Sequence, residues 1–333
     1  MDKILNIKIK NFKLFQDLEL DNIKRVNLIG GKNNIGKTAL LEAIELVTLP
    51  SSIIEVTYYI NRILSRRYKD IRNFEFDFIS NDKDMQIDIN HVNKLAIELF
   101  PTKQPKFRLL IDDQEVLPEP YASISFNHEI RQLPIRILTD NKENLNNFSI
   151  KRTKYIPSNT ISSFNIALLY SELVELDKEE FLNNSLKIFD KDIVALKQIT
   201  KENEVILKIK IKNKLYPLSS LGEGINRFIT ILCAIWASQD GYLLIDEIEN
   251  GIHYTHYKKL WEIIFKVSKE ANCQVFITTH SKECIEMFNE VNQDDDGCYL
   301  ELYKNKKDNI VVKQRGHDVL QYSLTHNGRF RGE

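Results

Sequence analysis

The chain has 333 residues, enough for one large domain or two with a complete hydrophobic core. Its 46 lysines and arginines almost balance its 47 aspartates and glutamates, so the net charge of −1 provides no overall positive field for nucleic acid or anionic membrane. The four cysteines include no CxxC pair and lack the spacing of metal ligands. No apolar run is long enough to span a bilayer and the charged start is unlike a signal peptide, so we expect a cytoplasmic protein without membrane contacts.

The first seventy residues predict a small β-layer followed by a strand, a loop and two helices. Residues 5–10 alternate apolar and polar side chains, which is typical of a half-buried strand, and residues 15–20 fit its antiparallel partner. Residues 26–29 form a short apolar strand candidate. Residues 39–46 carry apolar side chains at helical spacing, and residues 51–67 are also predicted to be helical.

A glycine-rich loop joins the apolar strand to the first helix. Residues 31–38 read Gly-Lys-Asn-Asn-Ile-Gly-Lys-Thr and fit the phosphate-binding pattern G-x-x-x-x-G-K-[ST]. Such a loop directs backbone N–H groups and a helix dipole at one point, where Lys37 reaches the β- and γ-phosphates and the Thr38 hydroxyl binds Mg²⁺. The expected nucleotide contacts are Gly31, Asn33, Asn34, Gly36, Lys37, Thr38 and Ala39.

The middle of the chain carries fewer functional signals. Residues 74–137 contain short strand candidates broken by prolines, and residues 153–157 form a buried strand candidate that ends at Ser158 and Asn159. Residues 164–199 show helical periodicity. Residues 207–212 alternate apolar side chains with lysines, and a row of lysines on a strand is more often a solvated face or protected edge than a DNA contact. No sustained heptad repeat indicates a coiled-coil arm.

A second strand ends in two adjacent carboxylates. Residues 242–245 are apolar, and Asp246 and Glu247 follow at the end where α/β sheets bind ligands. We expect Asp246 to hold Mg²⁺. Glu247, on the opposite side of the pleat, is then free to act as the base that activates water.

A third apolar strand covers residues 274–281 and ends in a polar Thr-Thr-His-Ser sequence. His280 at that end is expected to donate a hydrogen bond to the γ-phosphate or to the attacking water. Beyond it, residues 298–303 and 310–313 predict a β-hairpin joined by a polar turn.

The sequence Leu218-Ser-Ser-Leu-Gly-Glu-Gly224 precedes another helix pattern and predicts a second phosphate-binding helix end. Ser220 is expected to cap this helix, with Gly222 and Glu223 beside it. One nucleotide does not need two such helix ends, whereas two facing chains can each lend one to the other's ATP. The alternative is an ordinary helix cap.

The order of these motifs resembles the ABC-type ATPase heads of the SMC, RecF and OLD-nuclease group. Residues 155–158 and the helices behind them are most similar to the small OLD-like ATPases of bacterial defence systems. The glutamine that senses Mg²⁺ in SMC-type heads is missing, and Ser158 or Asn159 is the candidate substitute. Only about fifty residues follow His280, without the acidic cluster of the TOPRIM nuclease domain that OLD nucleases carry, so the chain resembles the ATPase alone.

The resemblance implies an α/β fold, a P-loop NTPase of the ABC-ATPase type with a mixed sheet, an antiparallel β-layer at the N-terminus and a helical lobe. A single head over residues 1–333 is expected. Its parts are a β-layer with the glycine loop and helix (1–70), a β-rich insert (71–152), a helical lobe (153–215) and the signature helix, acidic strand end, histidine switch and hairpin (216–333).

The resemblance also implies a Mg²⁺-dependent ATPase that works as a homodimer around two ATP molecules. We expect it to control a separately encoded effector, a nuclease or toxin, in defence against phage. One alternative is a RecF- or SMC-like ATPase of DNA repair or chromosome structure that binds DNA directly, through a basic groove with Arg66, Arg67 and Lys69. A second is a nucleotide-binding scaffold without hydrolysis, which has no need of Glu247.

Overall fold

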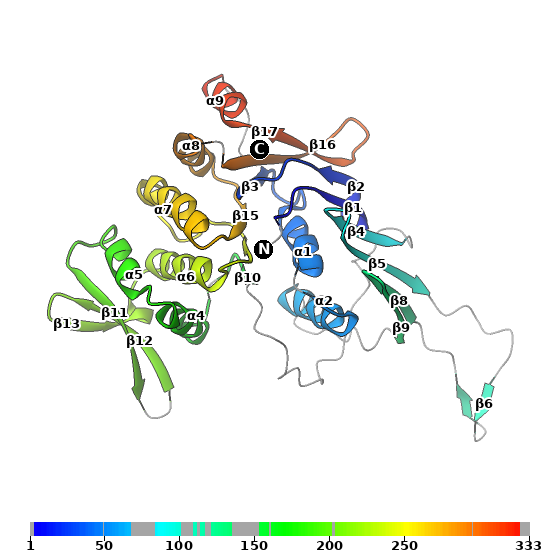
Figure 1. Cartoon of the computed structure of the whole chain (residues 1–333), viewed down its shortest axis with the longest axis horizontal. Coiled ribbons are helices and arrows are strands. Elements are labelled where there is room, and N and C mark those ends of the chain that lie inside the picture. Colours follow the sequence, from blue (N-terminus) through cyan, green and yellow to red (C-terminus); the bar gives the residue numbers. More distant parts are fainter. Residues whose placement is uncertain are drawn as a thin grey trace.

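The computed structural model describes residues 3–48, 50–67, 84–100, 109–111, 114–116, 121–134, 153–159, 161–201, 204–294 and 296–326. Figure 1 shows a central sheet with helices on both faces, a second sheet at the right of the view and a smaller lobe at the lower left. No helix among the described residues is both long and apolar enough to cross a membrane.

The central sheet brings the three predicted motif strands side by side. Its strands, in spatial order, are β10 (Thr153–Ile156), β14 (Tyr242–Ile245), β15 (Gln274–Thr278), β3 (Val26–Gly31), β16 (Gly297–Lys304) and β17 (Ile310–Arg315). The first five are parallel, and β17 turns back antiparallel on β16, as the predicted hairpin requires. The carboxyl ends of β3, β14 and β15 therefore meet at one edge of the sheet.

Each face of the central sheet builds its own hydrophobic core. On β15, Val275 and Ile277 face one core and Phe276 faces the other, as the two-residue period of a strand dictates. The first core is closed by α4 (Ser163–Glu175), α6 (Glu223–Ala237), α7 (Tyr257–Glu270) and α8 (Lys282–Val291). The second is closed by α1 (Lys37–Thr48), α2 (Ile53–Arg67) and the second sheet.

The second sheet is antiparallel throughout and joins the N-terminus to the β-rich insert. Its strands, in spatial order, are β2 (Phe15–Leu20), β1 (Ile7–Phe12), β4 (Met85–Ile89), β5 (Asn93–Phe100), β8 (Tyr121–Phe126) and β9 (Glu129–Pro134). The predicted pair of N-terminal strands is present. The described strands of the insert extend this β-layer, while β6 (Leu109–Ile111) and β7 (Gln114–Val116) form a separate hairpin.

Helix α1 lies between the two sheets, and two of its carboxylates are buried there. Glu42 accepts a 2.5 Å hydrogen bond from the Lys13 ammonium in the β1–β2 turn. Glu45 pairs with the Arg66 guanidinium of α2, which also lies 4.0 Å from the centre of the Tyr155 ring. A buried carboxylate needs such a partner. Arg66, which the DNA-groove hypothesis included, therefore contacts buried side chains of the interior. Lys69 of the same hypothesis lies outside the described residues.

The lobe differs from the helical prediction for residues 164–199. Helix α4 is followed by α5 (Glu179–Leu186), and then a three-stranded antiparallel sheet of β11 (Ile193–Lys201), β12 (Glu204–Ile211) and β13 (Lys214–Pro217). The prediction is wrong from residue 193 onward because β11 pairs with β12 along its whole length, and this tertiary pairing outweighs local periodicity. The lobe is therefore half sheet. At the C-terminal end, α9 (His317–Thr325) contacts α8 and β17.

Candidate active site

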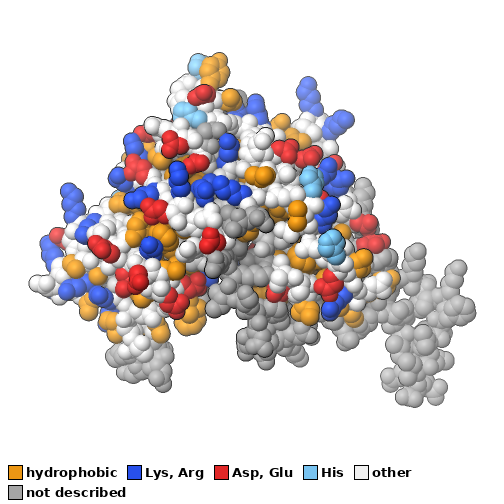
Figure 2. Space-filling model, in the orientation of Figure 1, with side chains coloured by type: hydrophobic (Ala, Val, Ile, Leu, Met, Phe, Trp, Pro, Cys, Tyr) orange, Lys and Arg blue, Asp and Glu red, His pale blue; other side chains and the backbone are white. Residues whose placement is uncertain are grey.

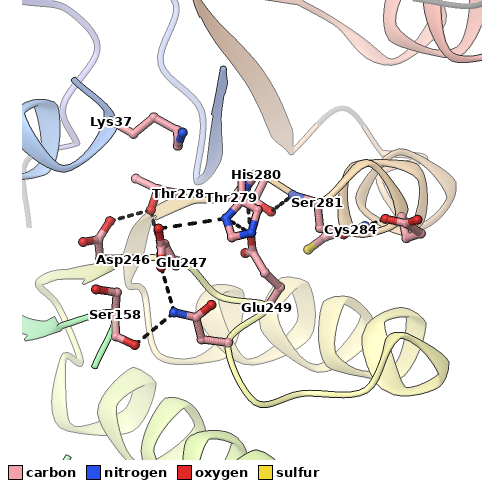
Figure 3. Close-up of polar contacts among 12 residues, drawn as sticks. Lys37, Ser158, Asp246, Glu247, Glu249, Thr278, Thr279, His280, Ser281 and Cys284 are labelled. Carbon is pink, nitrogen blue, oxygen red and sulfur yellow. Dashed lines mark hydrogen bonds and ion pairs between the residues drawn. The ribbon is translucent and has the colours of Figure 1, made fainter. Parts of the chain in front are cut away.

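The predicted site residues of the three motif strands meet at the carboxyl edge of the central sheet. Figure 3 shows Lys37, Asp246, Glu247 and His280 around one point, on segments that follow β3, β14 and β15. Lys37 and Asp246 are more than two hundred residues apart in the sequence, and the parallel pairing of the strands brings them together.

The glycine loop has the backbone conformation that its glycines were expected to allow. Gly31 and Gly36 have φ angles of +140° and +98°, and Asn34 has a φ of +59°. A Cβ at Gly31 would lie 2.5 Å from the Leu302 carbonyl oxygen, and one at Gly36 would lie 3.0 Å from the Phe15 ring. Side chains at these two positions would collide with the chain around the loop, so this loop conformation requires glycine there.

Lys37 begins α1 and is only 8% exposed. Its ammonium donates hydrogen bonds of 2.9 Å to the carbonyl oxygens of Gly31 and Lys32, so it is held across the loop. Burial lowers the pKa of Lys37, and the carboxylates of Glu247 and Glu249 are the main opposing influence. A triphosphate over the loop would place negative charge beside this ammonium and offset the cost of burying it. Ala39, two residues further on, is buried.

Thr38 and Asp246 form the predicted metal pair. The Thr38 hydroxyl donates to both carboxylate oxygens of Asp246, at 3.1 and 3.0 Å, and Thr278 Oγ1 donates to one of them at 2.7 Å. Asp246 is 4% exposed, and burial raises its pKa although both hydroxyl hydrogen bonds oppose this. A bound cation would favour its ionised form.

One hydroxyl and one carboxylate fit Mg²⁺, which prefers oxygen ligands and takes most of them from water and substrate phosphates. Within the described ranges no group of three or more His, Cys, Asp or Glu side chains stands ready to hold a metal by itself. The donor set therefore suits a metal that arrives with a nucleotide.

Glu247 lies beyond the end of β14 rather than on the opposite side of its pleat. Its φ is +51°, which turns the chain sharply, so the expected alternation with Asp246 does not apply. The backbone N–H of Glu247 donates to Thr278 Oγ1 at 2.7 Å, and its carboxylate accepts from Asn250 Nδ2 at 2.8 Å. Asn250 also donates to the Ser158 carbonyl oxygen at the end of β10. The carboxylate is held in place and remains accessible.

Arg227 of α6 is a site residue that sequence reasoning missed. Its guanidinium donates to the carbonyl oxygens of Pro157, Asp246 and Glu247, the last two at 2.5 and 3.1 Å. It is 7% exposed, and burial lowers its pKa. It thereby braces the backbone that carries the metal ligand and the candidate base. The available signal was a charged residue at the start of an otherwise apolar helix.

His280 lies closer to Glu249 than to the expected base Glu247. Its ring Nδ1 lies 2.9 Å from Glu249 Oε1, whereas Glu247 Oε1 is 3.9 Å away. The hydrogen bond to Glu249 raises the pKa of His280. Burial opposes the ionisation of Glu249, but the hydrogen bonds from His280 hold its pKa below the usual value.

The predicted second helix end is exposed, but Ser220 does not cap it. Ser220 lies in a short 3₁₀ turn, η3 (Leu218–Ser220), and its hydroxyl donates to the Pro217 carbonyl oxygen at 2.7 Å. Gly222 is the N-cap of α6 and makes no side-chain cap bond, so the capping prediction is wrong. The extended backbone at Leu221 separates the turn from the helix and carries Ser220 away from its first N–H groups.

Two glycines missed in the sequence join this helix end to the loop after Glu247. A Cβ at Gly224 would lie 2.3 Å from the Gly251 carbonyl oxygen, and Gly251 has a φ of +75°. Both positions therefore require glycine for the close approach. Ser220, Gly222 and Glu223 are exposed beside this contact.

The fold is that of the ATPase heads of SMC proteins. The SMC head bound to the C-terminal winged-helix domain of ScpA aligns over 95% of this chain and 99% of its own, with a TM-score of 0.58 and 13% identity. An SMC head with an extended coiled coil, bound to the C-terminal domain of ScpA derived from Pyrococcus furiosus, aligns over 97% and 99%, with a TM-score of 0.52 and 14% identity.

The sequence itself defines the family. Residues 26–286 match the family described as "AAA domain, putative AbiEii toxin, Type IV TA system", and the chain belongs to that family. A protein of Helicobacter pylori named "ATP/GTP phosphatase" is 26% identical over 94% of this chain and 95% of its own length. The solved structures confirm the ABC-ATPase fold that the order of motifs indicated, and the family and the Helicobacter pylori relative support a P-loop NTPase.

Proposed function

We propose that the chain binds ATP with Mg²⁺ at the carboxyl edge of the central sheet and hydrolyses it to ADP and phosphate. The observation that carries this proposal is the contact between the Thr38 hydroxyl and the Asp246 carboxylate, beside Lys37 and Glu247. The name of the Helicobacter pylori relative supports a hydrolase and includes GTP as a second nucleotide to assay.

Each of the chain's residues has a defined task in this proposal. Thr38 and Asp246 would hold a Mg²⁺ ion that arrives with the nucleotide, and the ion would supply positive charge to neutralise the phosphates. Lys37 binds the β- and γ-phosphates and offsets the charge that develops on them. Glu247, oriented by Asn250, accepts a proton from the attacking water. His280 donates a hydrogen bond at the γ-phosphate end.

We propose further that two chains close on two ATP molecules, each lending its Ser220–Glu223 segment to the partner's nucleotide. The supporting observation is that this segment is exposed, and that a side chain built at Gly222 would meet nothing within 4 Å. The segment stands at the N-terminal end of α6, and helix N-termini attract anions.

The substitution Glu247→Gln tests both parts. It preserves the size and hydrogen-bonding reach of the side chain but removes its capacity to accept a proton, so we expect phosphate release to fall by roughly 10²–10⁴-fold. ATP and Mg²⁺ binding should persist, and the variant should elute as a dimer on a sizing column that contains ATP.

Lys37→Ala serves as the control, because it should remain unaffected by ATP on the same column. Phosphate release by Glu247→Gln near the wild-type rate would exclude Glu247 as the base. Loss of hydrolysis without an ATP-dependent dimer would leave the chemistry in place and exclude the ATP-gated dimer.

We propose that the dimer controls a separate effector, a nuclease or toxin acting in phage defence in the cytoplasm. The family description, which names a toxin and a toxin–antitoxin system, supports this setting. Carboxylates after His280 are engaged in ion pairs, such as Glu301 with Arg315 and Asp308 with Lys304. The purified chain alone should therefore leave plasmid DNA uncut, and ATP-independent, metal-dependent cleavage by the chain would contradict a regulatory role.

Direct DNA binding, the alternative that the SMC-like fold suggests, has less support from the surface. Figure 2 shows basic and acidic side chains interspersed over the visible face. On α7 the exposed Lys258 and Lys259 each pair with a glutamate, and Arg66 is occupied by Glu45. Such local pairing weakens the positive field that would attract a phosphate backbone.

A further inference from the structure

Glu249 is engaged twice by one residue. Its Oε1 accepts a 2.6 Å hydrogen bond from the backbone N–H of His280 and a 2.9 Å contact from ring Nδ1 of the same residue. The Glu249 side chain is only 7% exposed. Its other oxygen, Oε2, is buried without a hydrogen-bond partner among the described residues. Burying a carboxylate with so few hydrogen-bond partners costs stability. Its contact with His280 therefore calls for a functional reason.

The His280 ring lies between two carboxylates that compete for it. Glu247 Oε1 is 3.9 Å from Nδ1, one ångström further away than Glu249 Oε1. Asn250 holds the Glu247 carboxylate from the other side, through its 2.8 Å hydrogen bond. Figure 3 shows His280 in contact with both carboxylates, and the shorter contact is the one with Glu249.

We propose that Glu249 is a positioning residue that fixes the His280 ring, with Nδ1 toward Glu249 and Nε2 toward the nucleotide. This inference rests on the proposed ATPase function. An imidazole whose Nδ1–H is bound to a carboxylate cannot rotate freely, so its other nitrogen is presented in one direction. The same bond keeps the ring from pairing with Glu247, which leaves that carboxylate available to water.

Removal of Glu249 should release the ring toward Glu247. The base would then gain a hydrogen-bond partner that weakens its capacity to accept a proton, and Nε2 would lose its fixed direction. A displacement of about 1 Å at a reacting group costs on the order of 10²-fold in rate. We therefore expect a lower kcat, with little change in the affinity for ATP, because Lys37, Thr38 and Asp246 are untouched.

The test is a double-mutant cycle of Glu249→Ala, His280→Ala and the double variant, with Glu249→Gln as the conservative replacement. If Glu249 acts through His280, the double variant should be no slower than His280→Ala alone. Glu249→Gln keeps an oxygen acceptor for both hydrogen bonds and should retain more activity than Glu249→Ala. Glu290→Ala removes an exposed glutamate paired with Lys258 and is the matched control, with unchanged kcat expected.

A spectroscopic measurement separates this inference from the ATPase proposal. In ¹⁵N-histidine-labelled protein, His280→Ala assigns the His280 signals. At pH 8 Nδ1 should be protonated in the wild type and in Glu249→Gln, and its signal should shift in Glu249→Ala, where the Glu249 acceptor is lost. Additive effects on kcat, or an Nδ1 signal unchanged in a folded Glu249→Ala variant, would overturn the inference. A wild-type protein that hydrolyses no ATP but shows the expected Nδ1 shift would contradict the proposed function alone.

Discussion

Burial determines how the charged residues of the site behave. Lys37 and Asp246 are both almost fully buried, and burial shifts the pKa of each toward its neutral form. A nucleotide with its metal brings the opposite charge to both residues. Burial therefore gives the site an electrostatic preference for the charged ligand, which a surface lysine and aspartate would lack.

The substitution Lys37→Ala should abolish ATP hydrolysis, because the Lys37 ammonium held across the glycine loop is the group expected to bind the β- and γ-phosphates. Binding of a fluorescent ATP analogue should weaken as well, since the charge on the β- and γ-phosphates loses its buried partner. Phosphate release and analogue titration measure the two effects.

Lys266→Ala, which removes an exposed lysine on α7, is the control and should match the wild type. An unaltered hydrolysis rate in Lys37→Ala would show that the glycine loop is not the active site.

At the scale of elements, α6 connects two regions that have separate tasks. Its N-terminal end carries the exposed Gly222 and Glu223, which the proposal assigns to the partner's nucleotide. One turn later, Arg227 binds the backbone of Asp246 and Glu247 in the same chain. Helix α6 is therefore fixed to the strand end of its own chain, while its N-terminal end is proposed to contact the nucleotide of the partner chain.

The substitution Arg227→Met should lower the free energy of unfolding by on the order of 3 kcal/mol, because three buried carbonyl oxygens lose a charged donor. Urea unfolding measures this loss. Phosphate release should also fall, because the Glu247 backbone is no longer braced.

Arg131→Met removes a half-exposed arginine on β9 that pairs with Glu129, and its stability should change by less than about 0.5 kcal/mol. Equal stability of the two variants would show that Arg227 is not a structural brace.

At the scale of the whole molecule, the two hydrophobic cores support different parts of the candidate site. The core between the sheets contains α1 and supports the glycine loop, and the core on the opposite face contains α6 and supports the Ser220 end. Figure 1 shows these elements on opposite sides of the central sheet. An arrangement of this kind places the two candidate phosphate-binding ends of one chain on different layers.

Mixing two inactive variants tests whether the Ser220 end acts on the partner's nucleotide. Lys37→Ala removes the phosphate-binding lysine from the glycine loop, and Ser220→Arg blocks the exposed N-terminal end of α6. Each homodimer should therefore be inactive. A mixed dimer retains one site with an intact loop and an intact Ser220 end, and part of the ATPase activity should return. Mixtures that exchange subunits, as shown by differently tagged chains, yet remain inactive would contradict the shared site.

Local pattern was sufficient for the motifs that lie on single segments. The glycine loop, the strand with Asp246 and Glu247, and the strand before His280 each combine an apolar strand with a polar end, and the structure places all three as predicted. A strand before the loop and a helix after it are properties of about twenty consecutive residues, so no distant contact was needed to infer them.

Tertiary structure decided which of these residues meet and how they are held. Arg227 of α6 hydrogen-bonds the backbone of Glu247, and Glu249 binds the ring of His280. Residues 193–201 form a strand because β12 lies beside them. These contacts depend on pairings between distant segments, which periodicity does not encode. The motifs and the resemblance carried by their order indicated the class of protein, and long-range packing determined the geometry of its site.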